Sequence, residues 1–124
     1  MTIKKICLVD DTTDLLRNLA QFLEMEGYEV WPYENGHDAL ERLKTETPHL
    51  IITDLWMPEM EGTELIRAVR SMLQLKNVPI AVFSAKPFQE YEAKVKIFNK
   101  MAYIKKPATL DEILTVVNEL LAIS

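Results

Sequence analysis

Short β-rich runs alternate along this chain with segments whose apolar residues recur at helical spacing, and this alternation constrains the fold most strongly. Five such runs and five helical segments follow one another along the 124 residues. Strands that alternate with helices imply right-handed crossovers, which build a parallel sheet with helices on both faces. The sequence therefore predicts an α/β fold.

The expected strands are short and are bounded by polar or turn-forming residues. Pro32 is expected to stop the second strand, and Asn35-Gly36 to form a turn after it. The five strands are expected at residues 3–9, 28–31, 50–53, 79–83 and 101–105.

The expected helices differ in the clarity of their apolar stripes. The last stripe is the clearest and has Thr109 at the N-cap position, while Gly27 is placed to cap the first helix. The segment from Gln89 to Phe98 is the weakest candidate, because its apolar positions are sparse. The stripes lie at residues 15–23, 39–43, 65–73, 89–98 and 110–121.

Composition narrows the class of protein. The length suits one domain over residues 1–124. No apolar stretch approaches the roughly 20 residues that span a bilayer, so we expect a cytoplasmic protein without a membrane segment. The net charge is −5 and no Lys/Arg cluster exceeds a pair, so we expect no direct binding to nucleic acid. The single cysteine, Cys7, lies in an apolar run and is expected to be buried and inert.

Polar residues stand where the expected strands end. Because the carboxyl ends of parallel strands meet at one edge of a sheet, we expect these residues to gather there. Three carboxylates in one place repel one another and call for a cation, and oxygen ligands suit Mg²⁺. A lysine and a hydroxyl at the same edge suit a phosphoryl group, and Asp54 could then attack phosphorus to give an acyl phosphate. The residues in question are Asp10, Asp11, Asp54, Ser84, Lys105 and Lys106.

Each of these residues also has a plainer interpretation. Asp11 or Thr12 could simply cap the first helix, and Asp54 could be an ordinary residue at the start of a loop. A Lys-Pro pair occurs twice, at residues 86–87 and 106–107. The prediction of a site rests on the joint pattern, in which polar residues stand at the ends of four different expected strands.

Taken together, the motifs resemble those of the receiver domains of two-component response regulators, in particular chemotaxis-like regulators. The resemblance covers the whole chain, and its spacing from the aspartate selects Lys106 over Lys86. It rests on Val9-Asp10-Asp11, on Asp54-Leu55-Trp56-Met57-Pro58 with Gly62, on Ser84-Ala85, and on Tyr103-Ile104-Lys105-Lys106-Pro107.

The resemblance implies a flavodoxin-like (βα)5 fold with strand order 2-1-3-4-5. It implies that Asp54 is the phosphoacceptor and that Asp11, Asp54 and the Trp56 carbonyl bind Mg²⁺, with Asp10 acting through water. Lys106 would hold the phosphoryl group. The Lys106-Pro107 bond is usually cis in such proteins.

Ser84 and Tyr103 would be the switch pair, whose packing changes when the phosphoryl group draws the serine hydroxyl inward. The implied protein is a signalling switch and not a metabolic enzyme. A histidine kinase or histidine phosphotransfer protein would phosphorylate it, and the face formed by the fourth helix, fifth strand and fifth helix would control a downstream protein or an output domain. A monomer and a phosphorylation-dependent dimer both fit this class.

The sequence departs from the family pattern at a few positions. Asn99-Lys100 replaces a small Gly-Ala pair before the switch tyrosine, and Ala108 stands where many relatives have Phe. Both changes fall in the partner-binding face. Trp56 and Lys86 flank the expected phosphoryl position, and our hypothesis is that Trp56 shields the acyl phosphate from water.

Two other classes of function remain as alternatives. One is a degenerate receiver that binds partners without phosphorylation, and the intact acidic pair, acceptor and lysine argue against it. The other is a haloacid-dehalogenase-like phosphatase. Such enzymes have Asp-x-Asp-x-Thr after the first strand, whereas this chain has Asp10-Asp11-Thr12-Thr13 and no room for a cap domain.

Overall fold

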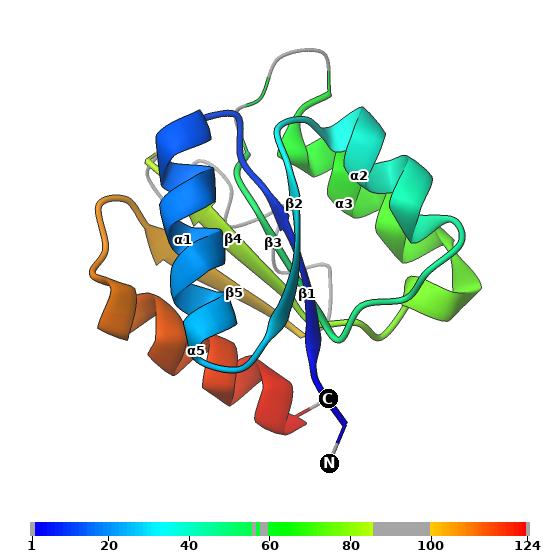
Figure 1. The fold of residues 1–124 in the computed structure, drawn as a ribbon. Helices are drawn as coiled ribbons and strands as arrows, with labels where there is room; N and C mark the ends of the chain where they lie inside the picture. The colour runs from blue at the N-terminus through cyan, green and yellow to red at the C-terminus, as the bar shows by residue number, and fades with distance from the viewer. Residues whose placement is uncertain (1, 56, 58–59, 86–99, 124) are drawn as a thin grey trace.

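A five-stranded parallel sheet lies at the centre of the molecule, with helices on both faces (Figure 1). The structure, a computed structural model, describes residues 2–55, 57, 60–85 and 100–123. The strand order is β2-β1-β3-β4-β5, as the family resemblance implied. The strands are β1 (Lys5–Val9), β2 (Glu29–Tyr33), β3 (Leu50–Thr53), β4 (Ile80–Ser84) and β5 (Met101–Lys105).

The helices are divided between the two faces of the sheet. One face is covered by α1 (Thr13–Met25) and α5 (Leu110–Ile123), the other by α2 (Gly36–Leu43) and α3 (Gly62–Ser71) (Figure 1). A single 3₁₀ turn, η1 (Leu73–Leu75), follows α3. The helix expected at residues 89–98 lies outside the described residues. None of the described helices is long and apolar enough to cross a membrane.

Alternation along the strands divides the core into two clusters. In β1, Ile6 and Leu8 pack under α1 and α5, whereas Cys7 and Val9 pack under α2 and α3. The strands are therefore apolar on both faces, as expected for a parallel sheet between two helical layers. Cys7 is fully buried, and burial raises the pKa of its thiol to about 12 although the charge of Arg42 lowers it slightly.

The prediction that Pro32 stops the second strand was wrong, because β2 continues through it to Tyr33. β2 is an edge strand. The Glu29 N–H donates to the Lys4 carbonyl, and the Tyr33 carbonyl accepts from the Asp10 N–H, so the odd-numbered residues bond to β1. Pro32 therefore turns towards the free edge, where no neighbouring strand needs the N–H that proline lacks.

Two helix boundaries also differ from the predictions. Asn35-Gly36 begins α2 directly, since the Asn35 side chain caps the helix by accepting from the Asp38 N–H at 2.8 Å. The third helix ends at Ser71, before the last two residues of its predicted apolar stripe. The chain then turns through η1, which buries Leu75 and leaves Leu73 exposed.

The expected helix ends at Gly27 and Thr109 are confirmed. Gly27 follows α1 with φ +98°, a conformation that glycine adopts without strain. The Thr109 hydroxyl accepts from the Glu112 N–H at 3.1 Å, which satisfies one of the free donors at the start of α5.

Candidate functional site

Three carboxylates gather beyond the carboxyl ends of β1 and β3. One oxygen from each of Asp10, Asp11 and Asp54 lies within 4.8 Å of the other two. Asp10 and Asp54 are 3% and 7% exposed, whereas Asp11 is open to solvent. Two nearly buried carboxylates at this separation repel each other strongly unless cations or hydrogen-bond donors offset them.

Lys106 supplies a cation at the centre of this cluster. Its Nζ lies 2.8 Å from Asp10 Oδ2 and 3.0 Å from Asp54 Oδ2, and its side chain is 16% exposed. Burial by itself lowers the pKa of Lys106, but its hydrogen bonds and ion pairs with the two carboxylates outweigh burial and raise that pKa. The Phe83 ring, 5.1 Å from Nζ, adds a cation–π contact.

Backbone N–H groups orient the two buried carboxylates. The Thr12 N–H donates to Asp10 Oδ1 at 2.9 Å, and the Leu55 N–H donates to Asp54 Oδ1 at 2.6 Å. In each carboxylate the other oxygen accepts from Lys106. The strands end here and the chain turns, so these donors are not used in the sheet and are available to the side chains.

The cluster is still strongly acidic after Lys106 is counted. Burial and the neighbouring Asp10 charge are the main causes that raise the pKa of Asp11. Among the described residues, three carboxylates face one ammonium, which leaves an excess of negative charge, and the atoms that could bind a metal ion are all carboxylate oxygens. This set fits a hard divalent cation such as Mg²⁺.

Gly62 is a part of the site whose structural role the sequence did not reveal. A Cβ on this residue would lie 2.1 Å from the Asp54 carbonyl oxygen and 2.8 Å from Leu55 Cα. The Gly62 N–H also donates to the Leu55 carbonyl at 3.0 Å. The first residue of α3 therefore packs directly on the backbone that carries Asp54, and only glycine fits between them. Its fixed spacing from the aspartate in the motif was the available signal.

Ser84 and Tyr103 lie together at the ends of β4 and β5. Ser84 is fully buried, and its carbonyl accepts from the Tyr103 hydroxyl at 3.3 Å and from the Lys106 N–H at 2.8 Å. Tyr103 is half-buried against the core cluster under α2 and α3. The backbone of Ser84 thus connects the tyrosine with the strand that leads to Lys106. The Lys106-Pro107 peptide bond is cis, as expected.

Comparison with known proteins identifies the family. Residues 6–118 match the family described as the response regulator receiver domain. The chain belongs to this family.

Similar proteins include one that this chain covers almost fully and others that are much longer. The receiver is 36% identical to the response regulator receiver protein CpdR of Brucella abortus, over 82% of this chain and 88% of CpdR. It is 37% identical to the transcriptional regulatory protein CrdR of Helicobacter pylori, over 89% of this chain and 51% of CrdR. It is 31% identical to the sensor histidine kinase TmoS of Ectopseudomonas mendocina, over 95% of this chain but only 12% of TmoS. The chain thus spans about half or less of several relatives that it matches.

Solved structures share the fold closely. The chemotaxis response regulator CheY4 of Vibrio cholerae superposes with a TM-score of 0.89 at 28% identity, over 96% of this chain and 99% of CheY4. A CheY-like receiver domain protein of Methanospirillum hungatei gives 0.90 at 29% identity, over 98% and 96% of the two chains. Receiver domains are regulators in two-component phosphorylation signalling. Their family binds Mg²⁺ at an acidic pocket.

Some predicted site residues of this receiver cannot be placed. Trp56 and Lys86 lie outside the described residues, as does Asn99. The plainer interpretation, in which Asp11 or Thr12 caps the first helix, is not supported: Thr12 holds the N-cap position of α1, but its side chain makes no capping hydrogen bond.

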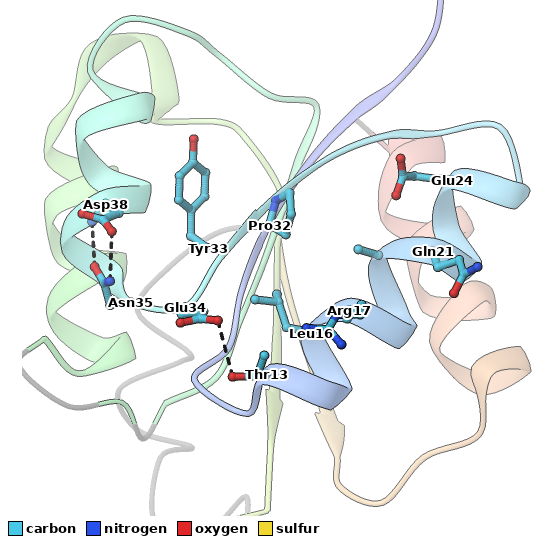
Figure 2. A pocket seen from close by; sticks show the side chains of 11 residues that line it. Thr13, Leu16, Arg17, Gln21, Glu24, Pro32, Tyr33, Glu34, Asn35 and Asp38 are labelled. Carbon is cyan, nitrogen blue, oxygen red and sulfur yellow. Dashed lines mark hydrogen bonds between the residues drawn. The ribbon is translucent and has the colours of Figure 1, made fainter.

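A groove of about 740 Å³ between α1 and the β2–α2 loop is a feature that the sequence did not suggest (Figure 2). Figure 2 shows the Thr13 hydroxyl joined to Glu34 across the gap, at 3.4 Å, and Asn35 paired with Asp38 on the α2 side. Its remaining charged groups include Arg17. The surface between α1 and α2 therefore contains a groove that is lined in part by polar and charged side chains.

Proposed function

We propose that Asp54 accepts a phosphoryl group from a phosphohistidine of a histidine kinase or histidine phosphotransfer protein. The observation that carries this proposal is the position of the Asp54 carboxylate, which contacts Lys106 at 3.0 Å within the cluster of Asp10 and Asp11. Such a donor works in the cytoplasm, and we place the receiver there.

In the proposed step, an Asp54 carboxylate oxygen attacks phosphorus in line. A P–O bond forms while the P–N bond of the phosphohistidine breaks, and the departing imidazole nitrogen retains the electron pair of that bond. The Leu55 N–H holds Asp54 Oδ1 in place at 2.6 Å, which orients the attacking group. Lys106 offsets the charge of the phosphoryl oxygens. In dephosphorylation, water attacks phosphorus, the P–O bond to Asp54 breaks, and inorganic phosphate leaves while Asp54 regains a free carboxylate.

Mg²⁺ would be held by the carboxylates of Asp11 and Asp54, with Asp10 acting through water and the Trp56 carbonyl as a further ligand. When bound, the ion neutralises negative charge on the phosphoryl oxygens. The exposed position of Asp11 beside the two buried carboxylates supports this arrangement, because an ion can be reached from solvent there while it keeps several waters.

We propose that Ser84 and Tyr103 transmit the modification. The Ser84 hydroxyl would turn towards the phosphoryl group, and Tyr103 would repack against the strand end. The contact between the Tyr103 hydroxyl and the Ser84 carbonyl supports coupling of these two residues. The face of β5, α5 and the residues between β4 and β5 would then bind a downstream protein or an output domain. The result is a population shift between two packings.

The test is to incubate the protein with Mg²⁺ and a small-molecule phosphodonor, and to measure its intact mass. Wild type should gain one phosphoryl group, and Asp54→Asn should gain none. Asp14→Asn is the matched control, since Asp14 is an exposed aspartate in the first turn of α1 and lies outside the cluster. Equal labelling of wild type and Asp54→Asn would refute the assignment. Unlabelled wild type would favour a phosphorylation-independent interaction module.

Trp56 provides a separate test of lifetime. We propose that its large side chain, two residues beyond Asp54, restricts water at the acyl phosphate. Trp56→Asn should then lose its phosphoryl group faster than wild type after the donor is removed. An unchanged dephosphorylation rate would show that Trp56 does not shield the site.

A further inference from the structure

Three exposed apolar side chains lie at the end of the sheet where the strands begin, opposite the carboxylate cluster. We call this the basal end, and both chain termini lie there (Figure 1). Ile3 precedes β1 and is 60% exposed, Met25 ends α1 and is 81% exposed, and Leu73 precedes β4 and is 86% exposed. Among the described residues, the one other large apolar side chain that is exposed is Leu110, at 42%. Three of the four large exposed apolar side chains among the described residues therefore lie at the basal end.

A basic groove of about 320 Å³, which we call the basal groove, lies at the basal end. It is lined by Lys4, His49, Leu73, Lys100 and neighbouring uncharged residues. No acidic residue lines it among the residues that the structure describes. Neither lysine has a carboxylate partner within the described part of the chain. Both ammonium groups are therefore available to an acidic partner.

The donors of the basal groove are oriented. His49 Nδ1 accepts from the Lys5 N–H at 2.9 Å, so the neutral ring carries its proton on Nε2 and is a further donor. Lys100 has φ 58°, a left-handed conformation that disfavours a side chain, and yet a lysine stands there. Leu73 adds an apolar wall to these donors. The groove thus suits an acidic segment that carries an apolar side chain.

The chain itself offers such a segment at the same end. Glu24-Met25-Glu26, which we call the acidic tip, forms the last turn of α1 and its C-cap. No basic residue occupies that turn, so two carboxylates stand at the negative end of the helix dipole without local compensation. Met25 stands between them in the sequence and is 81% exposed.

We propose that two copies of this chain associate through their basal ends, with the acidic tip of each copy in the basal groove of the other. Groove and tip lie at one end of the molecule, so a two-fold axis lets both contacts form at once and closes the assembly at a dimer. The carboxylates of Glu24 and Glu26 would pair with Lys4 and Lys100, and Met25 would cover Leu73. The site around Asp54 stays open, because it lies at the other end of the sheet.

Charge reversal tests the proposal by sedimentation of the full chain. The groove variant Lys4→Glu/Lys100→Glu and the tip variant Glu24→Lys/Glu26→Lys should each associate at least about tenfold more weakly than wild type, because like charges then face each other. An equimolar mixture of the two should recover the dimer, since each reversed surface meets its complement. This recovery separates a lost contact from a misfolded variant.

The matched control is Arg17→Glu/Arg67→Glu, which changes the net charge as the groove variant does but at exposed positions on α1 and α3. This control should retain the association of wild type. The proposal is overturned if wild type stays monomeric at millimolar concentration, or if the groove variant associates as well as the control. A different partner would be indicated if wild type were monomeric but bound an unrelated acidic peptide in the basal groove. In that case the NMR amide resonances of Lys4 and Lys100 would shift when the peptide is added, and the dimer proposal would be overturned.

Discussion

Replacement of Gly62 by alanine should damage both stability and phosphorylation through a single contact. The added Cβ would lie 2.1 Å from the Asp54 carbonyl oxygen and 3.0 Å from the Asp54 carbonyl carbon. All the atoms it meets belong to backbone, and no side chain can rotate away. Either the first turn of α3 or the segment after β3 must move by about an ångström, as expected for overpacking in a close-packed interior.

The segment after β3 is itself held in place. The Asp54 N–H donates to the Val9 carbonyl at 3.0 Å, and the Thr53 hydroxyl donates to the Asp54 carbonyl at 2.9 Å. We therefore expect Gly62→Ala to lose about 2–3 kcal/mol of unfolding free energy, near the upper end for overpacking. Because a displacement of about 1 Å at a reacting group can cost on the order of 100-fold in rate, phosphodonor labelling should slow by a similar factor.

Urea unfolding followed by circular dichroism measures the first effect, and timed intact-mass spectra measure the second. Gly36→Ala is the matched control. Its Cβ would meet the flexible side chain of Met60, with Sδ at 2.9 Å, and alanine favours the first turn of α2. We expect this variant to remain within about 1 kcal/mol of wild type. If Gly62→Ala proved as stable and as quickly labelled as Gly36→Ala, the steric reasoning would be refuted.

Three further predictions concern charge and burial. Lys106→Met should lower the free energy of unfolding in urea by about 3 kcal/mol, because it leaves buried carboxylates unpaired. Adding Asp54→Asn should restore part of this free energy, and a double variant with no recovery would contradict the charge argument. Burial, together with the charges of nearby lysines, lowers the pKa of His49 in the folded protein. The unfolded chain therefore binds a proton at His49 more readily, and the free energy of unfolding should fall as the pH drops below about 6.5. His49→Asn keeps an acceptor for the Lys5 N–H without titrating and should flatten the pH dependence of unfolding, whereas an unchanged slope would exclude His49 as its source. Cys7, whose pKa burial raises to about 12, should resist iodoacetamide at pH 8 until the protein unfolds; rapid labelling of the native protein would contradict its burial.

Much of the fold follows from the sequence because its local signals agree. All five strand positions match the prediction to within two residues at each end, since buried parallel strands are marked by continuous apolar runs. The prediction at Pro32 was wrong because a proline interrupts a central strand but is tolerated in an edge strand when its nitrogen faces the free edge of the sheet. Whether β2 is central or at the edge depends on the whole sheet, and no local pattern encodes it.

The end of α3 shows the same limit in a helix. Met72 and Leu73 continue the apolar stripe of residues 65–69, so periodicity alone extends the helix through them. In the structure the chain must turn back into β4, and η1 achieves this by burying Leu75 instead of Leu73. Packing against the sheet decided which leucine entered the core.

Among the site residues, the sequence by itself determined which chemical groups follow each strand: Asp10 and Asp11, Asp54, Ser84 and Lys106. Their convergence could be expected as soon as the sheet was taken to be parallel, because such strands end at one edge. Only the tertiary structure decided the contacts on which the chemistry depends. Lys106 lies 96 residues from Asp10, so its 2.8 Å contact arises from the packing of distant strands.

Gly62 and the basal end illustrate the same division. A glycine eight residues beyond Asp54 is visible in the sequence, but its contact with the Asp54 carbonyl exists only when α3 packs on the end of β3. Likewise, Lys4 and Lys100 are distant in the sequence and share a groove only because β1 and β5 begin at the same end of the sheet. Local sequence determines backbone preference and the chemical groups available, whereas distances between remote groups are set by the global packing of the sheet and its helices.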